Sequence, residues 1–476
     1  MFEPKLLING SFISTNETVD IYNPSNNEVI ARVPLINDPV AIDDVFKNAH
    51  LAFLDYQKTS VTTRVNLLNK FADAILTNKE ELANLLVLEI AKSKKDSLSE
   101  VVRTAEYMYD TIKAYEEMMN NPLSFDEKIL NTPNKSAIYT RVPLGVVLAI
   151  SPFNYPLNLL MTKLAPALVA GNTVVFKPAT QGSLVGLKIA ELAQQVGYPK
   201  GTVNSLMTNA RLNGDRLASN EYVRVINFTG SAPVGNHLAT VAKRANIFLE
   251  LGGKDPALVL DDADLNSTAA EIIKGAFSYS GQRCTAIKRV FVSQKNHDEL
   301  VKLLKEHALK LTVGLPENNS DIVPLINKKS VQYNLELIKD AVDKKAVLMT
   351  QVEVDEAHNL LSPVLIDQVT PDMRVAWEEP FGPILPIITY ENVEQAIQWI
   401  NQSEYGLQGS IFTTNYEQAA VYANQIETGT VNINKASSRG PDLLPFLGVK
   451  NSGFGVQGVK DALISVTSLK GLVINK

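Results

Sequence analysis

The feature that most constrains this sequence is a regular alternation of apolar runs and helical segments between residues 145 and 250. Strand-like runs are expected at 145–150, 173–177, 203–207, 223–228 and 246–251, and helices at about 157–170, 182–196 and 232–243. Short buried strands that alternate with helices pair in parallel, with helices on both faces of the sheet. The region therefore predicts a doubly wound α/β domain, which binds ligands beyond the carboxyl ends of its strands.

A second alternating region covers about residues 257–440 and predicts another α/β domain. Its strands are expected near 257–260, 289–293, 363–366, 385–389 and 429–433, and its helices near 297–310, 328–343, 394–401 and 416–426. The first forty residues predict short antiparallel strands, and residues 40–120 predict long helices. The segments 122–139 and 462–476 are polar and strand-like, and we expect them to form an edge ribbon for a partner chain.

Length and composition exclude several classes of protein. A chain of 476 residues is too long for one core. Its net charge of −6 argues against a nucleic-acid surface, and we interpret the nearest basic run, Lys92–Lys95, as a solvated helix end. The single cysteine excludes an internal disulfide and favours a reducing cytoplasm, while five histidines without paired spacing argue against a metal site. No signal peptide or membrane span is indicated.

The single cysteine, Cys284, lies in a glycine-containing segment between Arg283 and Arg289. A thiol is nucleophilic only as the thiolate, and nearby positive charge increases the thiolate fraction. Cys284 is therefore a candidate nucleophile. The alternative is a small buried hydrophobic side chain, which is the usual state of a lone cysteine.

Polar groups follow four of the strands predicted in the first α/β region. The segment Gly230–Gly235 leads from a strand into a helix, so its amides could face a pyrophosphate, although an ordinary tight turn has the same composition. Lys177 taken alone would be a solvated charge, Asn154 a turn cap and Glu250 an edge carboxylate. Their shared position at strand ends nevertheless places them at one edge of the sheet.

These segments, together with Gly281–Cys284 and Glu378–Pro383, resemble the aldehyde dehydrogenase superfamily in order and spacing over essentially the whole chain. The resemblance implies an α/β fold with a Rossmann-type parallel-sheet cofactor domain, an α/β catalytic domain and a small β oligomerisation ribbon. The implied domains are a cofactor-binding domain (1–121, 140–249 and 447–457), a catalytic domain (250–446) and an oligomerisation ribbon (122–139 and 458–476). A homotetramer is also implied.

The resemblance assigns a role to each of these groups. Cys284 would attack an aldehyde, Asn154 would stabilise the resulting oxyanion, and Glu250 would activate the water that hydrolyses the thioester. The implied cofactor contacts are Ser151, Pro152, Lys177, Thr180, Asp215, Gly230, Ser231, Gly235, Leu251, Glu379 and Phe381. Many NAD-dependent members carry a glutamate where this chain has Thr180, which favours NADP, with NAD as the alternative because residues 208–212 diverge.

Within the superfamily, residues 280–289, 99–106, 151–156 and 445–448 resemble the subgroup that oxidises glyceraldehyde 3-phosphate with NADP and without phosphorylation. The implied substrate contacts are Arg103, Tyr155, Arg283, Thr285 and Arg439. Several guanidinium groups and a phenol suit the three acceptor oxygens of a phosphate. The alternatives are a semialdehyde dehydrogenase, of the succinate semialdehyde type, and an inactive member of the family that acts as a binding protein.

Overall fold

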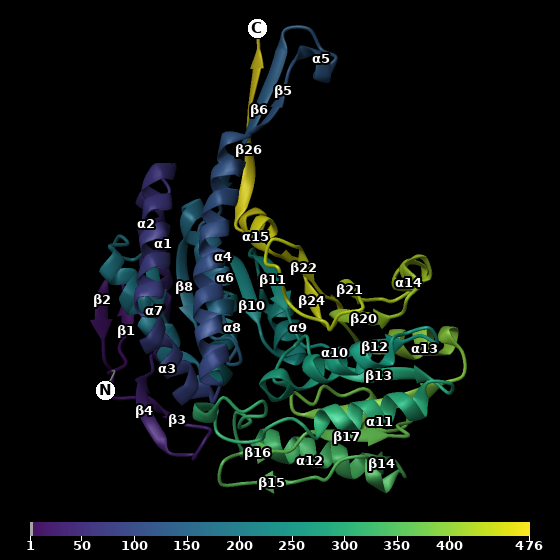
Figure 1. Cartoon of the computed structure of the whole chain (residues 1–476). Helices are drawn as coiled ribbons and strands as arrows, with labels where there is room; N and C mark the ends of the chain where they lie inside the picture. Colours follow the sequence, from purple (N-terminus) through teal and green to yellow (C-terminus); the bar gives the residue numbers. More distant parts are fainter. Residues whose placement is uncertain (1–2) are drawn as a thin grey trace.

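The computed structural model describes residues 3–476 and contains two large sheets that correspond to the two alternating regions (Figure 1). The first sheet has six strands in the order β24-β11-β10-β7-β8-β9. Its strands are β7 (Val146–Ile150), β8 (Thr173–Lys177), β9 (Val203–Ser205), β10 (Val223–Thr229), β11 (Asn246–Glu250) and β24 (Gly453–Phe454). All pair in parallel except β24, which is antiparallel to β11, so the predicted doubly wound sheet is confirmed.

Helices cover this sheet, and the most deeply placed is α6 (Asn158–Ala170), in which every residue is buried. The others are α1 (Pro39–Tyr56), α2 (Val61–Thr77), α3 (Lys79–Ile90), α4 (Lys94–Asn120), α7 (Ser183–Val196), α8 (Ala210–Ala218) and α9 (Ala232–Val241). Helix α6 packs against α2 and α4, which form an outer layer beside it (Figure 1). Helix α8 was not predicted, because its sequence is polar and contains Gly214.

The second sheet has the order β14-β17-β18-β13-β12-β20-β21 and is parallel apart from β14. Its strands are β12 (Asp255–Val259), β13 (Ile287–Ser293), β14 (Val347–Leu348), β17 (Val364–Asp367), β18 (Ile384–Tyr390), β20 (Gln408–Phe412) and β21 (Thr430–Ile433). Its helices are α10 (Leu265–Phe277), α11 (His297–Ala308), α12 (Lys328–Asp343), α13 (Val393–Asn401) and α14 (Tyr416–Ala423).

Sequence patterns missed α10 and the internal strand β20, as well as short strands such as β14 at the sheet edge. Strand β20 has the sequence Gln-Gly-Ser-Ile-Phe and is buried throughout. Its first three residues are not apolar, so the sequence did not indicate a core strand. Its position is fixed by pairing with β12 on one side and β21 on the other, which are interactions that local sequence does not reveal.

The predicted ribbon is a three-stranded antiparallel sheet of β5 (Leu123–Phe125), β6 (Lys135–Pro143) and β26 (Thr467–Asn475), which projects from the body of the molecule (Figure 1). The prediction of strand from residue 462 was wrong at its start, because α15 (Val459–Ser465) continues to Ser465. Val459, Ala462 and Leu463 are buried there at helical spacing, which favours a helix over a strand.

The remaining elements are short. They are β1 (Leu6–Ile8), β2 (Ser11–Ile13), β3 (Thr18–Tyr22), β4 (Val29–Pro34), α5 (Glu127–Leu130), β15 (Val354–Asp355), β16 (Leu360–Leu361), β19 (Tyr405–Gly406), β22 (Phe446–Leu447), β23 (Val449–Lys450) and β25 (Val456–Gln457). The β1–β2 and β3–β4 hairpins confirm the antiparallel strands expected near the N-terminus. Across residues 3–476, no helix combines the length and apolar character needed to cross a bilayer.

Candidate active site

The candidate site lies where the carboxyl ends of the first sheet approach the segment that carries Cys284. Asn154 follows β7, Lys177 ends β8, Gly230 follows β10 and Glu250 ends β11. These strands are neighbours in the sheet, so their polar ends share one edge, as the sequence predicted. The side chain of Asn154 crosses to the Cys284 segment, where its Nδ2 donates to the Gln282 carbonyl at 2.9 Å.

The Cys284 segment begins with three consecutive residues in the left-handed region, Tyr279, Ser280 and Gly281. Ser280 Oγ donates to the Val323 carbonyl at 2.7 Å and accepts from the Val323 amide at 2.8 Å. A Cβ on Gly281 would lie 2.3 Å from the Gly382 carbonyl oxygen, so no larger residue fits. This unusual backbone is held in place by neighbouring segments, which is typical of functional turns.

The surroundings of Cys284 favour the neutral thiol over the thiolate. Burial raises the pKa of Cys284 to about 12, and the negative charge of Glu250 adds to that effect while Lys288 opposes it. The main charges that act on Cys284 do not include Arg283 or Arg289, contrary to the expectation. Arg283 Nη2 bonds the Gly275 carbonyl, and Arg289 Nε bonds the Lys254 carbonyl. The nearby cation is instead Lys288, whose Nζ donates to the Cys284 carbonyl at 2.5 Å.

The loop that carries Asn154 and Tyr155 is fixed by a buried ion pair between Lys92 and Glu100. Lys92 Nζ also donates to the Asn154 carbonyl at 2.7 Å and lies 3.5 Å from the centre of the Tyr155 ring. Glu100 accepts from the amides of Leu157 and Asn158, each at 3.1 Å. The interpretation of Lys92 as part of a solvated helix end was therefore wrong, since its side chain is fully buried.

Two side chains bind Glu250, and a third supports one of them. Arg439 Nη1 donates to one carboxylate oxygen at 2.5 Å and Thr229 Oγ1 donates to the other at 3.1 Å, while Lys163 Nζ donates to Thr229 at 2.7 Å. Burial alone would raise the pKa of Glu250, but the charges of Arg439 and Lys163 and these hydrogen bonds hold it below its ordinary value. Glu250 is therefore a paired carboxylate in this state, and a weak base.

Two of the predicted substrate arginines meet directly. Arg103, on α4, binds both carboxylate oxygens of Asp442, at 2.8 and 2.9 Å, and donates to the Arg439 carbonyl at 2.9 Å. A pocket of about 140 Å³ opens beside Arg103 and Tyr155. Thr285 is buried on the Cys284 segment, and its carbonyl accepts from Ser437 Oγ at 2.9 Å.

Arg283 and Arg439 each keep one buried donor free of a partner within the described part of the chain. Neither Arg283 Nε nor Arg439 Nε makes a hydrogen bond. An unsatisfied buried donor costs about 1–3 kcal/mol, so both groups favour an acceptor that enters the site. Two of the predicted substrate residues thus have an N–H group that is available to bind a substrate.

The predicted cofactor residues form a second group along the same edge. Ser231 is the N-cap of α9 but makes no side-chain cap bond, so the amides at this helix start are not occupied by it. Gly235 packs so closely on Leu251 that a Cβ would lie 2.4 Å from its Cδ2. Ser151 Oγ is buried without a hydrogen bond, and Pro152 follows it in the loop after β7.

At the Lys177 end of the predicted cofactor site, a buried lysine lies near exposed polar residues. Burial lowers the pKa of Lys177, whose Nζ finds only the Pro178 carbonyl, at 3.3 Å. Thr180 is exposed nearby on the chain. Asp215 is also exposed and bonds His237 at 2.7 Å, which joins α8 to α9.

At the other end, Glu379 accepts from Lys288 Nζ and from the Gly253 amide, each at 3.1 Å. Phe381 has a left-handed backbone, with φ of +46°. Its ring and the Phe153 ring pack edge to face, with their centres 5.7 Å apart. Because Lys288 also binds the Cys284 carbonyl, it connects Glu379 with the backbone of the nucleophile.

Sequence reasoning gave no role to Lys92, Glu100, Lys163, Lys288 or Asp442. Lys92, Lys288 and Asp442 bind predicted site residues. Glu100 binds Lys92, and Lys163 binds Thr229 beside Glu250. One signal was available for Lys163, the single charged residue in the apolar segment 158–170. A lysine that a helix buries completely needs a partner, and so points to a functional or structural pair. For Asp442 no local pattern indicated the contact with Arg103, which is 339 positions away.

Two parallel α/β sheets that meet at one cysteine, with an extended ribbon, define an aldehyde dehydrogenase-like fold. The model of the Aldehyde dehydrogenase family matches residues 12–472, and the chain therefore belongs to this family.

Several relatives that are similar over the whole chain share one name. An NADP-dependent glyceraldehyde-3-phosphate dehydrogenase from Streptococcus equinus is 45% identical over 99% of this chain and 98% of its own length. The plant enzyme of the same name from Arabidopsis thaliana is 41% identical over 97% of this chain and 93% of its own length. The crystal structure of such a dehydrogenase from Bacillus halodurans C-125, complexed with NADP, is 45% identical with a TM-score of 0.97 over all of both chains.

Proposed function

We propose that this chain catalyses the irreversible, NADP-dependent oxidation of glyceraldehyde 3-phosphate to 3-phosphoglycerate. The observation that carries the proposal is Arg439, whose side chain is 11% exposed and which contacts both Glu250 and, through its carbonyl, Arg103. It thereby joins the predicted phosphate contacts to the predicted base. The whole-chain likeness to dehydrogenases of this substrate supports the assignment.

The proposed reaction begins when the Cys284 thiol gives its proton to water in the site and the sulfur bonds the aldehyde carbon. The aldehyde oxygen becomes an alkoxide, which is stabilised by the Asn154 amide and the backbone N–H of Cys284. NADP, when bound, would supply the hydride acceptor, so that this carbon would lose a hydride and the alkoxide would become the carbonyl of a thioester. Water then attacks the thioester, Glu250 takes its proton, and the C–S bond breaks to release the carboxylate.

The residues present fit a dinucleotide. The uncapped start of α9 offers amide donors for a pyrophosphate, and Ser151 Oγ is a buried group that needs a partner. A Cβ on Gly230 would lie 2.5 Å from the Phe228 ring, so the loop before α9 stays bare of side chains at that point. Lys177 gives a cation for a 2′-phosphate, and Thr180 adds no opposing charge.

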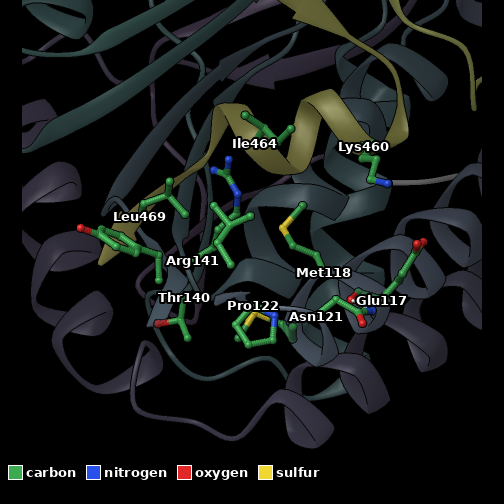
Figure 2. Close-up of a pocket in the computed structure, with 12 residues that line it drawn as sticks. Glu117, Met118, Asn121, Pro122, Thr140, Arg141, Lys460, Ile464 and Leu469 are labelled. Carbon is green, nitrogen blue, oxygen red and sulfur yellow. Dashed lines mark hydrogen bonds between the residues drawn. The ribbon is translucent and has the colours of Figure 1, made fainter. Parts of the chain in front are cut away.

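We further propose the domain boundaries given above and a homotetramer assembled through the ribbon. Strands β6 and β26 expose Ile138, Leu469 and Leu472, apolar residues that a partner chain would cover. Figure 2 shows a pocket of about 260 Å³ at the base of the ribbon, between α15 and the end of α4, with Met118, Ile464 and Leu469 on its wall. None of its lining residues belongs to the candidate site. A reducing cytoplasm suits a chain with one cysteine.

The test crosses two aldehydes, glyceraldehyde 3-phosphate and succinate semialdehyde, with NADP and NAD in one spectrophotometric assay. We expect the largest kcat/KM for the phosphorylated aldehyde with NADP, without added phosphate or coenzyme A. A larger kcat/KM for succinate semialdehyde would replace the phosphate assignment with the semialdehyde alternative. An absence of turnover with either aldehyde would favour a binding protein.

A further inference from the structure

We propose that the substrate phosphate releases the catalytic base, because it draws Arg439 away from Glu250 and frees that carboxylate to activate water. The inference rests on the proposed function and adds to it a second role for the phosphate. The phosphate would anchor the substrate and would also switch on hydrolysis of the thioester.

The contact that must open is the ion pair between Arg439 and Glu250. Arg439 Nη1 lies 2.5 Å from Glu250 Oε1, and the side chains are 11% and 2% exposed, respectively. The other Glu250 oxygen accepts from Thr229. A carboxylate that is paired with a guanidinium and hydrogen-bonded at both oxygens has little tendency to take a proton from water.

Such a carboxylate does not suit the deacylation step. A general base works best when its pKa lies near the working pH, whereas Arg439 and Lys163 hold the pKa of Glu250 below its ordinary value. Once Arg439 moves, burial favours the protonated form, and Glu250 becomes a stronger base. Thr229, which is bonded to Lys163, keeps the freed side chain at the end of β11.

The two arginines proposed to bind the phosphate, Arg103 and Arg439, are paired with carboxylates of the chain itself in this structure. Arg103 is bidentate with Asp442, while Arg439 Nε lies 3.8 Å from the same carboxylate and makes no hydrogen bond. Arg439 Nη2 donates to Gln457 at 2.9 Å. A phosphate dianion carries more charge than a carboxylate and has three acceptor oxygens, so it competes well for both arginines.

The consequence is selectivity in the second half of the reaction. An aldehyde without a phosphate would acylate Cys284 but leave Arg439 on Glu250, and its thioester would hydrolyse slowly. A free anion of the same charge and shape as the missing phosphate would then restore hydrolysis.

The first experiment supplies the substrate in two pieces. Unphosphorylated D-glyceraldehyde is mixed with the wild-type enzyme and NADP in a stopped-flow instrument, with and without phosphite dianion. We expect a burst of NADPH followed by a slow steady phase, and a saturable rise of about tenfold or more in the steady phase with phosphite. An unchanged steady phase, or acceleration of the burst alone, would overturn the inference.

The second experiment removes the charge of Arg439. In Arg439→Gln we expect the steady phase with D-glyceraldehyde to be fast without phosphite and insensitive to it, while the KM for glyceraldehyde 3-phosphate rises. Arg32→Gln, at an exposed arginine of β4, is the matched control and should respond to phosphite like the wild type. Slower hydrolysis in Arg439→Gln, with an intact burst, would contradict a restraining role.

The two proposals fail in different ways. If glyceraldehyde 3-phosphate is not oxidised with NADP by the wild type, the proposed function fails. If it is oxidised well, but phosphite does not change the turnover of D-glyceraldehyde, only the release of Glu250 by phosphate fails. The wild-type phosphite measurement decides the matter even if Arg439→Gln does not fold.

Discussion

Replacement of Lys92 by methionine tests whether the buried pair with Glu100 positions the oxyanion donor. Methionine keeps most of the length of lysine but removes the charge, the bond to the Asn154 carbonyl at 2.7 Å and the contacts with the Tyr155 and Tyr279 rings. Loss of one member of a buried ion pair typically costs about 3–5 kcal/mol. Glu100 would keep the amides of Leu157 and Asn158, so we expect the lower limit, about 3 kcal/mol.

This cost translates into a measurable change in Tm. At about 2.1 cal/mol/K per residue, a chain of 476 residues unfolds with an entropy of about 1 kcal/mol/K, so the Tm should fall by about 3 °C. Loss of an oxyanion donor costs about 10²–10³ in rate, and partial displacement of Asn154 should lower kcat by about tenfold. Differential scanning fluorimetry and steady-state assays measure the two effects.

A double variant and a neighbouring control complete the test. Lys92→Met with Glu100→Gln leaves no unpaired buried charge, so it should recover at least half of the lost Tm. Lys94→Met, at a lysine paired with exposed Glu80, should change the Tm by about 1 °C or less. A Lys92→Met protein with wild-type Tm and kcat, or a double variant no more stable than the single one, would refute the reasoning.

Three further predictions follow from individual contacts. Glu250→Gln should keep the NADPH burst with glyceraldehyde 3-phosphate but lose steady turnover by about a hundredfold or more in stopped-flow assays, because only deacylation needs the base; loss of the burst would contradict this order. Gly281→Ala should lower kcat more than tenfold, because the added Cβ would clash with the Gly382 carbonyl. Gly197→Ala is the control, since Gly197 also has a positive φ but has open space around it, and it should not lower kcat. Equal losses of kcat in the two variants would argue against a specific clash. Partial burial opposes the charged form of His297, but its hydrogen bonds to the Asp367 and Asp298 carboxylates raise its pKa. The stability that this residue contributes is therefore full below its unfolded pKa of about 6.5 and is lost as the pH rises through the higher folded value. The Tm measured across that range should fall less in His297→Gln.

The sequence predicted most of the fold because much of the pattern is local. Strands such as Val146–Ile150 are short apolar runs between turns, and the alternation with helices specifies a parallel sheet without knowledge of any contact. Elements defined by distant partners were missed, as with β20, whose polar residues are accommodated by its neighbours β12 and β21.

The candidate site divides in the same way. Cys284, Asn154 and Glu250 were predicted because each occupies a recognisable segment, whereas the contacts that hold them were not. Lys92 binds the Asn154 carbonyl across 62 positions, and Arg439 binds Glu250 across 189. Sequence spacing gives no measure of such contacts, and charge alone suggested that Lys92 was solvated.

The most direct test of the account is the identity of the residue that carries the acyl group. Glu250→Gln protein is mixed with glyceraldehyde 3-phosphate and NADP, quenched in acid after the burst, digested and analysed by mass spectrometry. We expect one 3-phosphoglyceroyl group on the peptide that contains Cys284, in an amount equal to the NADPH formed. NADPH formation with no acyl group on Cys284, or with the group on another residue, would contradict it.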